Sequence, residues 1–188
     1  MESTGNHYSK RSAVDQFDSE EKERLYKNYW DYIDNISIDL IKVSNNKDDI
    51  ILKEKLKLNA RAYARKIENK LLVPLNAFHR ITTIPDINEN RTNPIVQERA
   101  YFYKDNYEIN LPAEYKIESI PESINLITPF GTYKTSVEKI SDSQVIFKRE
   151  FQLNNNSFEA EKYNDFRDFM RAVKKRDQQK LIAIKQLN

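Results

Sequence analysis

The sequence predicts a mainly β fold with flanking helices, of the α+β class, built around an antiparallel β-sandwich. Apolar segments with a period of two recur between residues 36 and 153, and turn residues separate them roughly every 8–12 residues, which is typical of sandwiches. Helical periodicity is confined to one segment near each end of the chain. With 188 residues, 39% of them hydrophobic, the chain is long enough to bury a core without disulfides or metal ions.

The N-terminal part of the chain is predicted to hold a tail and a helix. Residues 1–17 are rich in Ser, Asn and charged side chains, so we expect a flexible tail or linker. A helix is predicted over residues 18–35, because Asp18 can cap its first turn and Glu21 has the spacing of a capping box. Apolar and aromatic side chains follow on one stripe of this helix, at Leu25, Tyr26, Tyr29, Trp30 and Ile33.

Residues 36–188 are expected to form the β-sandwich domain. A hairpin opens it, because two alternating segments flank a turn at Asn45–Asp48. Further strands are expected over residues 70–74, 95–103, 107–111, 115–120, 124–128, 131–140 and 144–153. Residues 76–94 carry few periodic cues and are expected to form a long loop. A closing helix over about residues 160–176, with apolar side chains on one face, precedes a short final strand near residues 181–184.

Charge and composition exclude several classes of protein. The net charge of +2, from 31 basic and 29 acidic residues, lacks the basic excess of a dedicated nucleic-acid binder, so no nucleic-acid partner is predicted. No apolar stretch approaches the roughly 18 residues of a transmembrane helix, so no membrane span is predicted. The absence of cysteine excludes disulfides, thiolate zinc sites and cysteine nucleophiles.

No catalytic residue, metal ligand or cofactor site is predicted. The two histidines, His7 and His79, lack the spacing of a metal site, and we expect both on the surface. The two glycines, Gly5 and Gly131, form neither a nucleophile elbow nor a phosphate-binding loop. A carboxylate-based hydrolase is a weaker alternative, because 29 acidic residues allow many chance pairs of carboxylates.

Two groups of aromatic residues are candidates for binding surfaces. The first group lies on the predicted helix and comprises Tyr26, Tyr29, Trp30 and Ile33. It either docks against a partner or packs on the sandwich of its own chain. The second group comprises Tyr101, Tyr103 and Tyr107. Exposed aromatic side chains of this kind bind carbohydrates or peptides, whereas buried ones belong to a core, and both interpretations stay open.

Short motifs in the second half of the chain follow a characteristic order. They are Leu111-Pro112-x-Glu114-Tyr115, Pro129-Phe130-Gly131-x-Tyr133 and Tyr163-x-x-Phe166-Arg167-x-Phe169. Glycine in the second motif is expected to let the chain turn or approach a neighbour closely. In this order, over about residues 71–185, the chain resembles the C-terminal β-rich domain of unknown function of bacterial transglutaminase-like proteins, which follows their transglutaminase-like core.

The resemblance implies a function without catalysis. A transglutaminase-like core uses a Cys-His-Asp arrangement, and this chain has no cysteine. The resemblance therefore implies a non-catalytic accessory module that packs against the catalytic core, in the same parent chain or a separate one. A stand-alone carbohydrate- or peptide-binding sandwich is the alternative. Full-length members resemble exported cell-envelope proteins, so a periplasmic or cell-envelope location is expected, although residues 1–12 carry no secretory signal.

Overall fold

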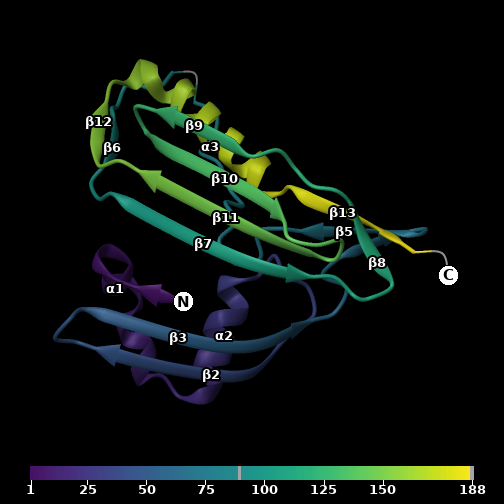
Figure 1. The fold of residues 1–188 in the computed structure, drawn as a ribbon. Helices are drawn as coiled ribbons and strands as arrows, with labels where there is room; N and C mark the ends of the chain where they lie inside the picture. The colour runs from purple at the N-terminus through teal and green to yellow at the C-terminus, as the bar shows by residue number, and fades with distance from the viewer. Residues whose placement is uncertain (89, 187–188) are drawn as a thin grey trace. The chain divides into compact units, whose positions relative to one another are not determined.

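A computed structural model describes residues 1–88 and 90–186 of the chain (Figure 1). The chain divides into two compact units, unit 1 over Met1–Tyr63 and unit 2 over Ala64–Asn188. Antiparallel strands dominate unit 2, and unit 1 combines an antiparallel sheet with helices, which confirms the mainly β, α+β class for the chain. The division corrects the expectation of one sandwich domain over residues 36–188, because the first hairpin belongs to unit 1.

Unit 1 contains a three-stranded sheet in the order β1-β3-β2 and its helices. Its elements are β1 (Glu2–Ser3), α1 (Gly5–Arg11), the 3-10 helix η1 (Ser12–Gln16), α2 (Ser19–Tyr29), β2 (Ile36–Asn46) and β3 (Ile51–Ala60). Residues 1–17 are therefore not the flexible tail that was expected. Their polar groups have partners on β3, since the amino group of Met1 donates to the carbonyl of Glu54 at 2.7 Å and Arg11 Nη2 contacts Glu54 Oε1 at 2.6 Å.

Helix α2 begins where its capping residues predict. Asp18 Oδ1 accepts a hydrogen bond from Glu21 N at 2.8 Å, and Glu21 Oε2 accepts one from Asp18 N at 3.0 Å, which completes the capping box. The helix ends at Tyr29, earlier than the predicted residue 35, because the backbone of Trp30 leaves the helical region at φ −113° and ψ 40°.

Unit 2 contains two four-stranded antiparallel sheets and a two-stranded ribbon of β6 and β12. Its strands are β4 (Arg65–Ile67), β5 (Lys70–Pro74), β6 (Ile95–Gln97), β7 (Tyr101–Asn110), β8 (Tyr115–Ser119), β9 (Ile124–Thr128), β10 (Gly131–Lys139), β11 (Gln144–Leu153), β12 (Asn156–Phe158) and β13 (Lys180–Lys185). One sheet has the order β7-β11-β10-β9 and the other β4-β5-β13-β8. The 3-10 helix η2 (Ala160–Lys162) leads into α3 (Tyr163–Asp177), and β13 follows, which confirms the predicted closing helix and final strand.

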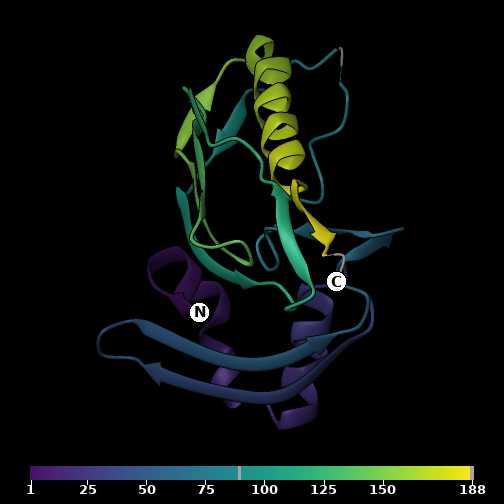
Figure 2. The same ribbon diagram turned by 45° about the vertical axis from the view of Figure 1, so that its right-hand side comes forward.

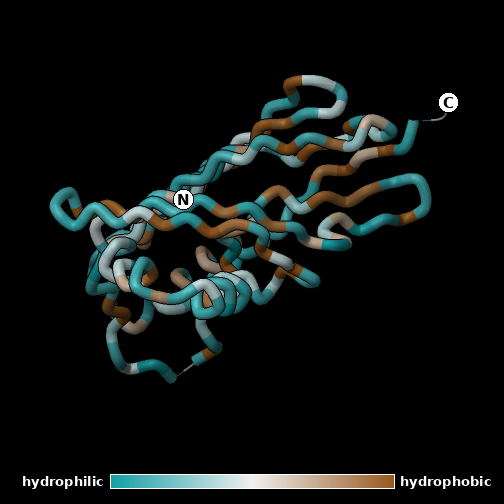
Figure 3. The backbone as a smooth tube through the Cα atoms, turned by 90° about the horizontal axis from the view of Figure 1, so that it is seen from below, coloured by the Kyte–Doolittle hydropathy of each residue, from teal (hydrophilic) through white to brown (hydrophobic). Residues whose placement is uncertain are grey.

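Helix α3 covers one face of the sheet β7-β11-β10-β9 (Figures 1 and 2). Hydrophilic and hydrophobic residues alternate along the strands, as Figure 3 shows, so each strand turns one side toward the helix. The buried core between sheet and helix comprises Ile95, Phe130, Tyr133, Phe151, Tyr163, Phe169, Met170 and Val173.

The motif residues of α3 also hold the long loop that precedes β6. Tyr163 Oη donates to the carbonyl of Asp86 at 2.8 Å, and Arg167 Nε donates to the carbonyl of Pro85 at 2.8 Å. These bonds fasten a segment without regular secondary structure to the helix, in a loop where residues 76–88 and 90–94 are described. The aromatic motif of α3 thus has a structural role.

Gly131 permits the close approach that its motif predicts. A Cβ atom at this position would lie 2.0 Å from the carbonyl oxygen of Gln152, on the neighbouring strand β11. Beside it, the ring of Phe130 is 6% exposed and packs edge-on against Phe158 and Phe166, at centroid distances of 4.7 and 5.4 Å. The glycine lets β10 and β11 meet while its neighbour fills the core.

Candidate functional site

A buried polar cluster in unit 2 centres on Arg149, in the middle of β11. Every second residue of this strand faces the core, and Arg149 falls in phase with the buried Phe147 and Phe151. Its whole residue is only 1% exposed. On the neighbouring strand β7, Asp105 lies directly opposite Arg149 in the register. A charged side chain this deeply buried requires partners of opposite charge.

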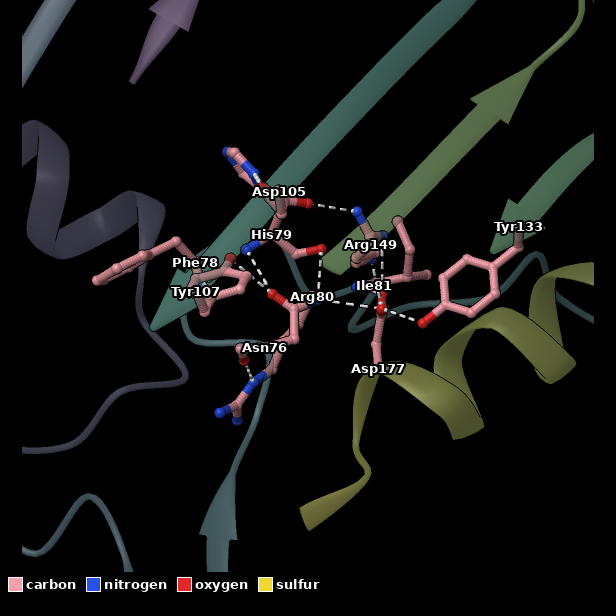
Figure 4. Close-up of polar contacts among 10 residues, drawn as sticks. All are labelled: Asn76, Phe78, His79, Arg80, Ile81, Asp105, Tyr107, Tyr133, Arg149 and Asp177. Atoms are coloured by element: carbon pink, nitrogen blue, oxygen red, sulfur yellow. Dashed lines mark hydrogen bonds and ion pairs between the residues drawn. The ribbon is translucent and has the colours of Figure 1, made fainter. Parts of the chain in front are cut away.

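Two carboxylates bind the guanidinium of Arg149 (Figure 4). Nε donates to Asp177 Oδ1 at 2.7 Å and Nη2 donates to Asp177 Oδ2 at 3.0 Å, in the bidentate geometry that arginine favours. Nη1 donates to Asp105 Oδ2 at 3.0 Å. Asp177 is the last residue of α3, where the helix dipole disfavours a negative charge, so the guanidinium compensates it.

Three more donors converge on the carboxylate of Asp177. Tyr133 Oη donates to Oδ1 at 2.9 Å, Asn76 Nδ2 donates to Oδ1 at 3.0 Å, and the backbone N–H of Ile81 donates to Oδ2 at 2.9 Å. These donors come from β10 and from the loop after β5. The carboxylate therefore ties the end of α3 to two strands and to that loop.

His79 lies at the edge of this cluster and contacts solvent. Its Nδ1 bonds to Asp105 Oδ1, and the two side chains are 20% and 6% exposed. Asn76 fixes the histidine backbone from both sides, since Asn76 Nδ2 donates to His79 O and His79 N donates to Asn76 Oδ1, each at 3.1 Å. The expected surface histidine is thus a partly buried, hydrogen-bonded residue.

The cluster perturbs the ionisation of two of its members. Burial alone would lower the pKa of Arg149, but the charges of Asp177 and Asp105 outweigh it and raise that pKa above its ordinary value. Burial, reinforced by the charge of Asp177, raises the pKa of the Tyr133 hydroxyl. The guanidinium therefore stays charged and the phenol stays neutral.

The geometry of the Arg149 cluster suits a structural role better than catalysis. An Asp–His pair orients histidine in many enzymes, but nucleophilic catalysis also needs a hydroxyl or thiol beside the ring. The hydroxyls of the cluster belong to Tyr133, which donates to Asp177, and to Tyr107, which donates to Asn76 Oδ1 at 3.0 Å. The guanidinium of Arg149 occupies the space between the two aspartates, where a carboxylate hydrolase would hold its substrate.

The aromatic stripe predicted on the first helix is largely buried. Tyr26, Trp30 and Ile33 are 0%, 2% and 6% exposed, whereas Tyr29 is 40% exposed. The rings of Tyr26 and Trp30 stack at a centroid distance of 5.5 Å, and Tyr26 Oη donates to Glu54 Oε1 at 2.5 Å. Of the two interpretations of this stripe, these contacts favour packing within the chain over docking to a partner.

The tyrosine platform predicted on β7 is half-buried. Tyr101, Tyr103 and Tyr107 share one face of the strand with the buried Asp105. Tyr103 and Tyr107 stack on phenylalanine rings of β11, at centroid distances of 6.3 and 5.8 Å. The exposed aromatic residue of β7 is instead Phe102, on the opposite face, at 50% exposure. These contacts favour a core role for the tyrosines over a binding platform.

Neither a metal site nor a spanning helix is found in the described part of the chain. Within residues 1–88 and 90–186, no three His, Cys, Asp or Glu side chains are grouped so that they could hold a metal ion. Over the same residues, every helix is too short or too polar to cross a membrane.

A comparison with known families finds a match for the part of the chain that holds the Arg149 cluster. The family DUF3858, described as a domain of unknown function with a solved structure, matches residues 69–183. The chain belongs to the DUF3858 family. The matched segment lies within unit 2 and contains the whole Arg149 cluster. Unit 1 lies outside the match.

One solved structure is similar in fold to this DUF3858 chain. It is a candidate protease from Parabacteroides distasonis, with a TM-score of 0.51 and 16% sequence identity over 62% of this chain. The chain spans only 24% of that protein's length, so the likeness shows a shared fold within a longer chain. A search of curated proteins finds no match.

Proposed function

We propose that this chain is a non-catalytic accessory module of a larger protein and packs against a transglutaminase-like or protease-like catalytic core. The observation that carries the proposal is the closed bonding of the Arg149 cluster. Both carboxylates bind the same guanidinium, and the phenol of Tyr133 donates to one of them. The most deeply buried ionisable groups of unit 2 therefore hold the domain together.

Two further observations support an accessory role. The similar fold in the candidate protease occupies part of a chain about four times longer than the matched domain, since this chain covers 24% of it. The motif order resembles that of a domain which follows a transglutaminase-like core. The same resemblance supports a cell-envelope location, which antibody detection in separated cell fractions would test.

The test is binding between this chain and a separately produced transglutaminase-like core from the same genome. Isothermal titration is expected to show a saturable complex, and the core is expected to melt at a higher temperature in its presence. Circular dichroism of the chain confirms beforehand that it is folded. A folded chain that neither binds nor stabilises the core would overturn the proposal.

A surface variant can locate the contact. Tyr29→Ala removes the exposed member of the helix stripe, so weaker binding by this variant would identify α2 as the docking element. Lys27→Ala is the matched control, because Lys27 lies two residues before Tyr29 on the same helix and its side chain is 43% exposed. Trp30→Ala is unsuitable, because its buried ring supports the fold of unit 1.

A further inference from the structure

A second feature of unit 2 lies on the sheet face opposite to α3. It is a hollow of about 290 Å³ on strands β7, β10 and β11. Asp105 and Arg149 of the buried cluster also line it, and its six outward-facing lining residues are Lys104, Asn106, Lys134, Ser136, Lys148 and Glu150. They alternate along their strands with the residues that face the core, so they belong to the solvent side. We call this group the lysine hollow.

Strand register fixes how the lysine hollow is arranged. Glu150 pairs with Lys104 on one side and with Lys134 on the other. Two residues along, Lys148 pairs in the same way with Asn106 and Ser136. Paired side chains on one face of a sheet have Cβ atoms about 4.5–5.5 Å apart. The residues therefore form two adjacent rows on a hydrogen-bonded sheet.

The positive charge of the hollow is only partly neutralised. Lys104 Nζ lies 3.3 Å from Glu150 Oε1, in a pair whose side chains are 71% and 42% exposed. Lys134 and Lys148 make no ion pair with any residue that the structure describes. Three ammonium groups and one carboxylate leave a net charge of +2 over the six outward-facing residues.

We propose that the lysine hollow binds the phosphate group of a small phosphate monoester. Such a group carries a charge of about −1.5 to −2 at neutral pH, which complements the hollow. Lysine binds phosphate as a point charge, and the hydroxyl of Ser136 and the amide of Asn106 add neutral donors. A site of this size suits a small ligand better than a macromolecule. The proposal does not depend on the accessory role.

An acidic border limits the site on one side. Glu108 and Glu138 are the next outward-facing residues after Asn106 and Ser136 on the same strands. Glu108 already accepts a hydrogen bond from Gln144 Nε2 at 2.7 Å. Like charges repel, so the phosphate group is placed between Lys134 and Lys148, beside Ser136, and away from this border.

The test is a titration of the isotope-labelled full chain with glycerol phosphate, followed by amide chemical shifts. Saturable shifts are expected on β7, β10 and β11 around the lysine hollow. Lys134→Gln and Lys148→Gln are each expected to weaken binding by about tenfold, the loss of one charge-assisted hydrogen bond. Lys66→Gln, an exposed lysine on β4 in the other sheet, should leave the affinity unchanged.

The most discriminating variant is one that is expected to bind more tightly. Glu150→Gln removes the central carboxylate and releases Lys104, so it is expected to tighten binding several-fold, which an unfolded variant could not do. Three results would each overturn the proposal. The first is chemical shifts that do not saturate, and the second is an equal loss of affinity in Lys134→Gln and Lys66→Gln. The third is acetate binding as tightly as glycerol phosphate at matched ionic strength. Tighter binding of a single-stranded oligonucleotide at the same amides would also overturn it, in favour of a nucleic-acid surface.

Discussion

At the scale of single residues, the stability of unit 2 depends on Arg149. Replacing it with alanine leaves two aspartates buried without their cation. Breaking a buried ion pair in this way costs about 3–5 kcal/mol, so we expect Arg149→Ala to lower the free energy of unfolding by about that amount. Urea denaturation followed by circular dichroism measures the change.

The triple variant Asp105→Leu, Arg149→Met and Asp177→Leu is the control for this prediction. It removes all three charges together, and buried ion pairs exchanged for apolar side chains often cost little stability. We expect it to recover most of the loss. If it unfolds as easily as Arg149→Ala, uncompensated charge is not the cause of the loss.

Tyr133 gives unit 2 a dependence on alkaline pH. Its pKa is raised in the folded state by burial and then by the charge of Asp177, whereas an unfolded tyrosine ionises near pH 10. Above about pH 10 the unfolded chain therefore binds fewer protons than the folded chain, and the free energy of unfolding falls as pH rises. In denaturation between about pH 8 and pH 11, Tyr133→Phe should be less stable at pH 8 but decline less steeply. An equal decline in both proteins would contradict this role.

The Arg149 cluster is absent from the sequence-based prediction, although the residues carry a signal. Lys104, Asp105 and Asn106 form a polar run between the strands predicted over residues 95–103 and 107–111. The structure has one continuous strand, β7, with Asp105 facing the core. In β11, Arg149 similarly interrupts the apolar phase. When two residues of opposite charge occupy core-facing positions on neighbouring strands, they indicate a buried ion pair. That β7 and β11 are neighbours, however, is not evident from local sequence.

At the scale of secondary-structure elements, the hairpin of β2 and β3 shows what local sequence determines. The turn predicted at Asn45–Asp48 lies two residues later in the structure, at residues 47–50, and Asn46 Oδ1 accepts hydrogen bonds from Asp48 N and Asp49 N, each at 3.1 Å. The backbone of Ile50 was not predicted, because its left-handed conformation, φ 57°, is uncommon for a β-branched residue. The capping box of α2 and the apolar face of α3 were predictable for the same local reason.

Ile50 is therefore a position where stability can be gained. The left-handed region costs an ordinary residue about 1–2 kcal/mol, and asparagine tolerates it better. Because the side chain is 51% exposed, little buried area is lost in Ile50→Asn, and we expect the free energy of unfolding to rise by about 1 kcal/mol. Ile50→Val keeps the β-branch and should show no gain. A destabilised Ile50→Asn protein in urea denaturation would count against backbone strain at this turn.

At the scale of the whole molecule, the class of fold was predictable and the division into units was not. Alternating strands and two helical segments indicate an α+β protein wherever the boundary lies. The boundary falls between Tyr63 and Ala64, where no proline- or glycine-rich linker marks it. Residues 1–17 look like a tail in the sequence because they are polar. The partners of their polar groups lie on β3, in a distant part of the sequence, so local sequence does not reveal them.

Because the chain divides into two compact units, we expect unit 2 to fold by itself. Its sheets, its helix and the Arg149 cluster all lie between residues 64 and 186, and the family match over residues 69–183 falls inside it. A fragment starting at Ala64 is expected to give dispersed amide resonances and a cooperative thermal transition. A fragment with collapsed, undispersed resonances would show that unit 2 requires unit 1.

One measurement tests the accessory role most directly. Peptide hydrolysis and amide transfer are assayed with the chain alone, with the transglutaminase-like core alone, and with both together over a range of chain concentrations. We predict no turnover by the chain alone and a saturable change in the rate or stability of the core when the chain is added. Turnover by the chain alone that His79→Ala abolishes would contradict the proposal, because the Asp105–His79 pair would then be catalytic.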